Sequence, residues 1–225
     1  MRRRKLLTTS GFALGMALKP YGRASAVTPA ATPTDRNDPD PIEFEGEGVA
    51  ITDEFEVESG PAIVDSTHDG DSTFDVQAVP SENGQDYHLV TQTGIFDGTT
   101  GSFIEEGTYV LYVDADGEWT VTVRQPRVSE TEADDPPVSI DSSGSDWIGP
   151  ILFDRTTRLA ARYRGESSFR IDLIPQTADD SEYLWEGSEL IFNAIGPFEG
   201  ITGVHTDGVG YLSVEGDGEW RLRIE

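Results

Sequence analysis

The fold is decided by residues 109–123, which read YVLYVDADGEWTVTV. Five apolar residues, 109–113, precede the polar turn 114–117, and every second residue is apolar in 119–123. Alternation with a period of two indicates a β-strand with one buried face, and an Asp-Gly turn between two such runs is a strong hairpin signal. We therefore expect an antiparallel β-hairpin here.

A second stretch of this kind, residues 211–224, belongs to a wider similarity between two parts of the chain. Three segments match in the same order: 74–80 with 169–175, 94–101 with 196–203, and 116–119 with 217–220. Such self-similarity is the signature of a repeated unit. We predict two tandem copies of one domain of about 85 residues, which is long enough for a small independent core.

Further strands follow from the same alternation. We expect them at residues 49–57, 62–68, 73–79 and 86–93 in the first copy and at 158–164, 168–174 and 189–195 in the second. Short strands at about ten-residue spacing, with hardly any helical period, predict an all-β fold. The expected architecture is two tandem antiparallel β-sandwich domains of the jelly-roll or Ig-like kind, at 42–126 and 138–225. Two polar segments that contain Pro, 27–41 and 127–137, are the expected linkers.

Composition excludes several classes of protein. The chain has 225 residues, of which 42 are acidic and 16 basic, with a formal net charge of -26. Because this charge repels phosphate, we exclude a nucleic-acid-binding protein. The chain has no Cys, which excludes disulfides, thiol nucleophiles and thiolate metal sites.

The first 26 residues differ from the rest. They hold six basic residues and no acidic one, and Arg3-Arg4-Lys5-Leu6-Leu7 leads into a short apolar run and the A-x-A site Ala24-Ser25-Ala26. This pattern resembles a twin-arginine signal peptide, which exports folded proteins. The apolar run is too short for a permanent transmembrane anchor. We therefore predict a protein that is secreted or held at the cell surface.

The remainder of the chain has the composition of a salt-adapted protein. After residue 26 its ten basic residues are all Arg, and none is Lys. Such an acidic surface repels itself in dilute buffer, where the Debye length is roughly 30 Å, and much less in molar salt, where it is roughly 3 Å. We therefore expect a halophilic protein whose stability depends on salt.

A family resemblance rests on the pattern Gly107-x-Tyr109-x-Leu111-x-Val113 followed by Trp119-x-Val121-x-Val123. It resembles the closing hairpin of secreted β-sandwich modules of the pre-peptidase C-terminal kind, over about 20 residues in each copy. The resemblance implies a non-catalytic extracellular module of the type appended to secreted enzymes. The chain departs from the usual setting of that family, because no protease domain accompanies the modules.

A calcium site is the one cofactor that the sequence suggests. Asp69 and Asp71 flank a glycine, and Asp97 with Asp114 or Asp116 could supply further oxygens if their loops meet at one end of the sandwich. The alternative is that these are ordinary polar turns on an acidic surface. The second copy has Arg164 at the same place, which disfavours a cation there.

Two groups of residues are candidates for binding. Tyr183 and Trp185 lie in the longer loop region of the second copy and share one strand face, where they could stack on sugars or contact a protein; alternatively they cover the sandwich end. Arg158, Arg162 and Arg164 alternate with apolar residues and should face outward, and Arg170 follows. We weigh three roles for these arginines: docking of the two domains, binding of an anionic ligand, or a solvated face.

The sequence holds little that indicates catalysis. It has three His residues and no G-x-S-x-G, H-E-x-x-H or phosphate-binding glycine motif. We predict that the protein is not an enzyme but an exported binding module. Its expected partner is a surface glycan or a cell-envelope or secreted protein. The alternatives are a carbohydrate-binding module using Tyr183 and Trp185, and a hydrolase using surface carboxylates.

Overall fold

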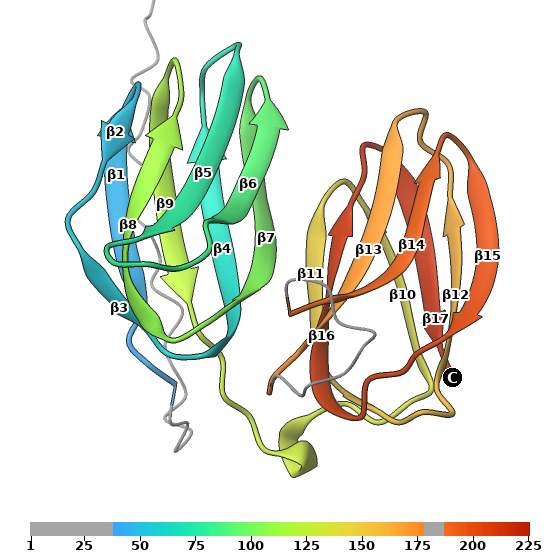
Figure 1. Ribbon diagram of the computed structural model, residues 1–225. Coiled ribbons are helices and arrows are strands. Elements are labelled where there is room, and N and C mark those ends of the chain that lie inside the picture. Colours follow the sequence, from blue (N-terminus) through green and yellow to red (C-terminus); the bar gives the residue numbers. More distant parts are fainter. Residues whose placement is uncertain (1–37, 178–186) are drawn as a thin grey trace, which may run out of the picture. The chain divides into compact units, whose positions relative to one another are not determined.

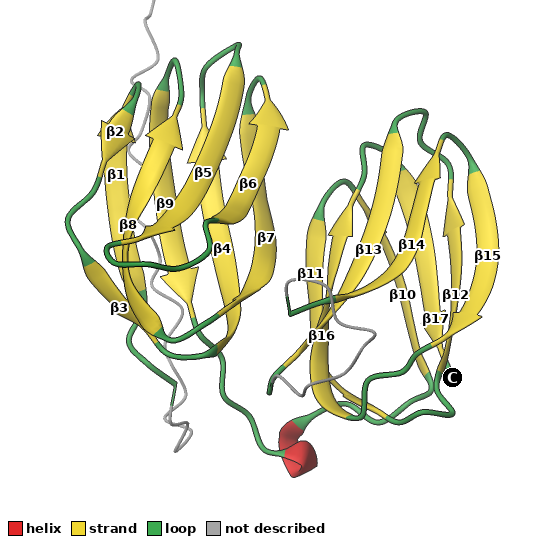
Figure 2. Cartoon of the chain, in the orientation of Figure 1, coloured by secondary structure: helices red, strands yellow, loops and turns green. Residues whose placement is uncertain are grey.

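The computed structural model describes residues 38–177 and 187–225, and these are almost entirely β-strand. Figure 2 shows one helical element in this part of the chain, the short 3-10 turn η1, Glu130–Glu132. The all-β prediction is confirmed. In the described ranges, no helix has the length and apolar character needed to cross a membrane.

The strands form two sets, one before η1 in the sequence and one after it (Figure 1). The first set is β1 (Ile42–Glu47), β2 (Ala50–Ile51), β3 (Phe55–Val57), β4 (Gly60–His68), β5 (Thr73–Pro80), β6 (Tyr87–Thr93), β7 (Phe96–Ile104), β8 (Gly107–Asp114) and β9 (Glu118–Arg124). The second set is β10 (Val138–Ser143), β11 (Asp146–Phe153), β12 (Arg158–Tyr163), β13 (Ser168–Pro175), β14 (Glu189–Ile195), β15 (Phe198–Gly203), β16 (Gly208–Glu215) and β17 (Glu219–Ile224).

Each set forms an antiparallel sandwich of two sheets. The first pairs the sheet β1-β9-β4-β7 with β2-β8-β5-β6, where β3 also pairs with β8, and the second pairs β10-β17-β12-β15 with β11-β16-β13-β14. Strand order is therefore the same in both sandwiches. Most connections cross from one sheet to the other, which is the jelly-roll arrangement rather than the Ig-like one.

The predicted hairpin at residues 109–123 is wrong, although its two strands are correct. β8 pairs with β2, β3 and β5, whereas β9 pairs with β1 and β4, so they lie in opposite sheets. A two-residue hairpin of type I′ needs positive φ at its Gly, and Gly117 is not at positive φ. Instead Gly117 packs against Gly70 of the neighbouring loop, and Ala115 enters the core. β16 and β17 are likewise in opposite sheets.

Other strand predictions are refined. The expected strand 49–57 is two short strands, because the Thr52 hydroxyl accepts a hydrogen bond from the Leu111 amide at 2.9 Å and interrupts the ladder between them. The structure also contains strands that the alternation did not predict, namely β1, β7, β10, β11 and β15.

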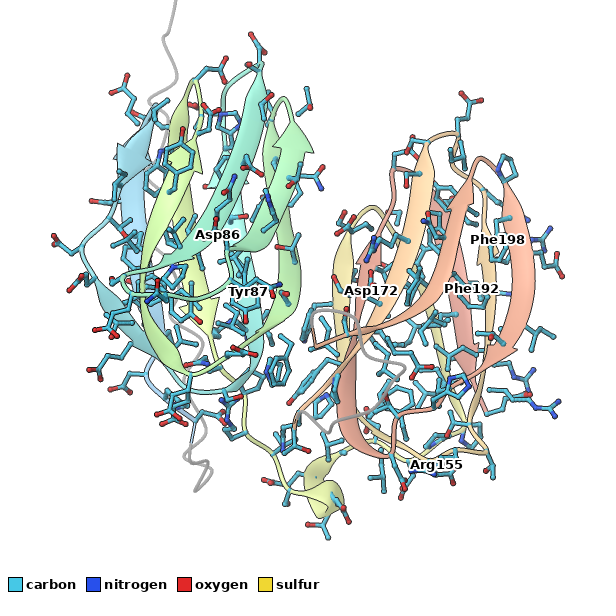
Figure 3. The ribbon with its side chains drawn as sticks, viewed as in Figure 1. Asp86, Tyr87, Arg155, Asp172, Phe192 and Phe198 are labelled. Atoms are coloured by element: carbon cyan, nitrogen blue, oxygen red, sulfur yellow. The ribbon has the colours of Figure 1, made fainter. Side chains whose placement is uncertain are left out.

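Each sandwich encloses its own hydrophobic core. Trp119 and Trp220 are buried in the two cores, each 3% exposed. Their indole N–H groups donate to the carbonyls of Gly48 at 3.0 Å and Gly144 at 2.8 Å, which ties each ring to the neighbouring turn. In the second core Phe192 and Phe198 meet edge to face at 5.2 Å (Figure 3).

The segment predicted as the linker 127–137 is anchored to the second sandwich. The side-chain amide of Gln176 both accepts from the Val128 amide at 2.9 Å and donates to its carbonyl at 2.8 Å. Val128 is buried against Val209 and Tyr211. Asp134 bridges to Ile151. The expected linker 27–41 lies mostly outside the described residues.

Candidate anion-binding face

Five arginines share the outer face of the sheet β10-β17-β12-β15. They lie on its two central strands or directly after them, and all are exposed: Arg158, Arg162, Arg164, Arg221 and Arg223. The intervening residues Leu159, Ala161 and Tyr163 are buried, so the strand parity predicted for β12 is correct. These five are half of the ten arginines after residue 26. We call this surface the arginine face.

The arginine face has a central row that runs across all four strands. Strand register places Asp141, Arg221, Arg162 and Glu199 side by side. Arg162 is therefore directly opposite Arg221, and like charges in this position are destabilising. The stability of the fold therefore does not explain why two arginines are paired here.

The two arginines of this row have different surroundings. Arg221 Nε donates to Asp141 Oδ1 at 2.5 Å, and this hydrogen bond and charge raise the pKa of the Arg221 guanidinium. No carboxylate in the described ranges lies within ion-pair distance of Arg162. Its guanidinium donors are therefore available to a group from outside the chain.

The first sandwich shows what the same row looks like without arginine. Its equivalent row is Glu45, Thr120, Thr67 and Asp97. Thr67 Oγ1 and Thr120 Oγ1 share a hydrogen bond of 2.7 Å. The outer acidic residues are kept, while a neutral pair stands where the second sandwich has two arginines. The fold therefore does not require the arginine pair.

Two of the three remaining arginines of the face make exposed ion pairs. Arg164 lies 3.9 Å from Glu219, and Arg223 lies 2.5 Å from Glu225. Exposed pairs of this kind contribute about 0–1 kcal/mol each. A small pocket of about 160 Å³ opens among these side chains, and its lining is Asp141, Arg162, Arg164, Glu219, Trp220 and Arg221. This size suits a single carboxylate group better than an extended ligand.

The corresponding face of the first sandwich is acidic. Its outward, exposed carboxylates are Glu43, Glu45, Glu47, Asp97 and Glu118, and we call this surface the acidic face. Arg124 also lies here, but its Nε is bound to Asp65 at 2.6 Å. A groove of about 700 Å³ runs along the acidic face, with the Thr67 and Thr120 side chains in its lining.

Arg170, predicted together with the β12 arginines, lies apart from them. It belongs to β13, in the other sheet of the sandwich. Its guanidinium makes two bonds to the carboxylate of Asp172, one of them from Nη2 at 2.8 Å, and Asp172 is 8% exposed (Figure 3). This pair is an internal bridge of that sheet. The structure thus brings three of the four predicted arginines together.

The predicted calcium residues stabilise loops. Asp69 Oδ1 accepts a hydrogen bond from the Glu118 amide at 2.7 Å, and Asp116 accepts from the Ser72 amide at 3.1 Å. Asp71 is exposed. Within 38–177 and 187–225, no group of three His, Asp or Glu side chains is placed to hold a metal ion. Calcium at these positions stays a prediction.

Next to these loops, each sandwich has a ring that stacks on a Phe and contacts an Asp. The sequence analysis did not predict this arrangement. In the first sandwich the His68 ring stacks on Phe74 at 4.7 Å and its Nε2 lies 3.3 Å from Asp116. In the second sandwich Tyr163 stacks on Phe169 at 4.4 Å and its hydroxyl donates to Asp217. The number of residues from His68 to Tyr163 equals the number from Phe74 to Phe169. This equal spacing is the sequence signal that His68 and Tyr163 occupy equivalent positions in the two sandwiches.

These end groups are held by contacts within each sandwich. His68 Nδ1 lies 2.9 Å from the Gly94 carbonyl oxygen, and the ring is buried. The hydrogen bond from Tyr163 lowers the pKa of the Asp217 carboxyl, which also accepts from Ser167. The constellation closes one end of each sandwich.

Another carboxylate that could suggest chemistry also anchors a loop. Glu189 is 4% exposed and accepts hydrogen bonds from the backbone amides of His205 and Thr206 at 3.0 and 3.1 Å. The His205 ring is 2.7 Å from the same carboxylate. In the first sandwich the Tyr87 hydroxyl accepts from the Glu105 amide in the corresponding place. The shared task is to fix this loop.

Tyr183 and Trp185 lie outside the described residues, in the range 178–186. Carbohydrate binding through these two aromatics therefore stays a prediction.

No protein-family model matches the chain, and no curated protein matches it.

Proposed function

We propose that the protein is an exported, salt-adapted, non-catalytic binding module, and that its arginine face binds carboxylate groups on an acidic protein surface outside the cell. The observation that carries this proposal is the cross-strand pair of Arg162 and Arg221. At the same row of the same fold, the first sandwich has Thr67 and Thr120. The same sandwich frame therefore forms with or without the arginine pair.

Arginine suits a carboxylate partner in concentrated salt. Its planar guanidinium presents N–H groups in a fork that matches the two oxygens of a carboxylate. At about 1 M salt the Debye length is roughly 3 Å, so long-range attraction disappears while direct contacts remain. A partner recognised by bidentate contacts is therefore compatible with brine.

Other features support the setting of this module. The basic leader with its A-x-A site supports export, and the absence of Lys after residue 26 supports adaptation to salt. The equal strand order and the paired ring-on-Phe caps support duplication of one domain. After duplication, the outer faces of the two copies diverged in charge.

Titration calorimetry with poly-L-glutamate in about 1 M NaCl tests the proposal. We expect the whole chain to bind and R162T/R221T to bind at least about tenfold more weakly, because each lost charge-assisted hydrogen bond is worth about 1.5–3 kcal/mol. The double variant installs the pair found in the first sandwich, so it should fold. R155T is the matched control, since Arg155 lies in the turn before β12 (Figure 3).

A reciprocal variant sharpens the test. T67R/T120R places an arginine pair on the acidic face, between the Glu45 and Asp97 positions. We expect it to bind poly-L-glutamate more tightly than the unaltered chain. Equal binding by the unaltered chain and R162T/R221T, or no binding at all, contradicts the proposed function.

A further inference from the structure

The two faces differ in their charged side chains and in the length of the side chains at their centres. They are built on equivalent strands, so each presents a four-stranded pleated surface with the same row spacing. On the acidic face the centre of the row is formed by the short side chains of Thr67 and Thr120, and the groove lies there. On the arginine face the equivalent positions carry the long side chains of Arg162 and Arg221. The groove of the acidic face therefore lies at the row positions where the arginine face carries two arginines.

Exposed carboxylates line the groove of the acidic face, where they could accept hydrogen bonds from arginine side chains. Glu45 and Glu118 come from β1 and β9, and Asp97 comes from β7, so they line the groove from both sides. All three are exposed. Ile95 adds an apolar rim and is 76% exposed. The acidic face therefore has the chemistry that the arginine face requires of a partner.

We infer that the partner of the arginine face is the acidic face of a second copy of this chain. The inference rests on the proposed function, which supplies the preference of the arginine face for carboxylates. Each chain carries one face of each kind, so the contact is heterologous and leaves both partners with an unused face. Association of this type continues into rings or open chains of molecules.

The size of the faces sets the strength of the contact. Four strands about 4.8 Å apart and about six residues long give roughly 400 Å² for each face. Stable interfaces bury about 1,200–2,000 Å² in total, so this contact is weak and needs a high local concentration. The net charge of -26 repels a second copy in dilute buffer. Salt screens that repulsion, and association is therefore stronger in molar salt than in dilute buffer.

Sedimentation velocity of the whole chain across a concentration series in about 2 M NaCl tests the inference. We expect the mean sedimentation coefficient to rise with protein concentration for the unaltered chain and for R155T. R162T/R221T should remain monomeric over the same range. A chain that stays monomeric throughout, or an R162T/R221T variant that associates equally, overturns the inference.

A charge exchange identifies the two faces. R162E/R221E has two acidic faces, and E45R/E118R has arginines on both, so each variant alone should be monomeric. Their mixture should associate, because each face then meets its opposite. Circular dichroism of the separate variants shows that both are folded. A mixture of folded variants that stays monomeric overturns the inference.

The two proposals can fail separately. If the unaltered chain binds poly-L-glutamate through Arg162 and Arg221 but never self-associates, the partner is another acidic protein and only the second-copy inference falls. If R162T/R221T changes neither binding nor association, both proposals fall.

Discussion

Substitution of Gly165 by Ala tests the cap of the second sandwich most directly. Gly165 lies between β12 and β13, and a Cβ there would come closer than 3.0 Å to Tyr163 Oη and Asp217 Oδ1. The Tyr163 ring cannot withdraw, because it is 1% exposed and stacked on Phe169 at 4.4 Å. The added methyl group therefore has to break the bond between Tyr163 and Asp217 or shift the loop.

The magnitude follows from the overpacking. Forcing extra atoms into a filled site costs about 1–3 kcal/mol, so we expect G165A to lose about 2 kcal/mol of unfolding free energy. In a domain of this size each kcal/mol lowers Tm by about 4–8 °C, so Tm should fall by about 8–16 °C.

Scanning calorimetry in molar NaCl measures this difference, and the chain supplies its own control. Gly203 also lacks a positive φ, and a Cβ there has the Thr157 carbonyl oxygen, 3.9 Å away, as its nearest neighbour. G203A should change stability by less than about 0.5 kcal/mol. If G165A and G203A melt within about 2 °C of each other, the described cap does not constrain the sandwich end.

Two further predictions concern salt and pH. Tm should rise steadily from about 0.01 M to molar NaCl as the Debye length falls from roughly 30 Å to 3 Å, and a Tm that ignores salt in calorimetric scans contradicts salt adaptation. The Tyr163 hydrogen bond lowers the pKa of the Asp217 carboxyl in the folded protein. The stabilisation that this bond gives the fold is therefore fully present above the unfolded-state pKa of about 3.9, and it is lost as pH falls through the folded-state pKa. Urea unfolding should therefore show Tyr163→Phe to be less stable than the unaltered chain at pH 7, with a difference that shrinks below about pH 4; a difference independent of pH contradicts this role for Asp217.

The sequence predicts strands well where alternation is strong and poorly where it is not. Residues 109–113 and 119–123 combine apolar alternation with β-branched and aromatic side chains, and both are strands. β7 reads FDGTTGSFI, in which two glycines and three hydroxyl residues hide the alternation. Its place at a sheet edge beside β4 comes from tertiary pairing, which no local pattern encodes.

The pairing of strands explains both the wrong hairpin and the missed arginines. An Asp-Gly turn favours a hairpin only when it adopts positive φ, and at Gly117 close packing against Gly70 takes precedence. Arg221 and Arg223 alternate with buried residues, so the sequence places them on an outer face. That this face is also that of Arg162 follows only from the pairing of β17 with β12. Strand parity can be read locally, whereas sheet neighbours cannot.

In each sandwich only one pair of consecutive described strands lies side by side, β5 with β6 and β13 with β14. Every other ladder joins strands that are distant along the chain. Most of the sheet structure therefore cannot form until remote segments of the chain come together. Proteins with such non-local pairings assemble in milliseconds to seconds rather than microseconds. A nascent chain of this design exposes unpaired edges throughout that interval. Export in the folded state, which is the expectation for the twin-arginine-like leader at residues 1–26, would let this slow folding finish before the protein leaves the cytoplasm.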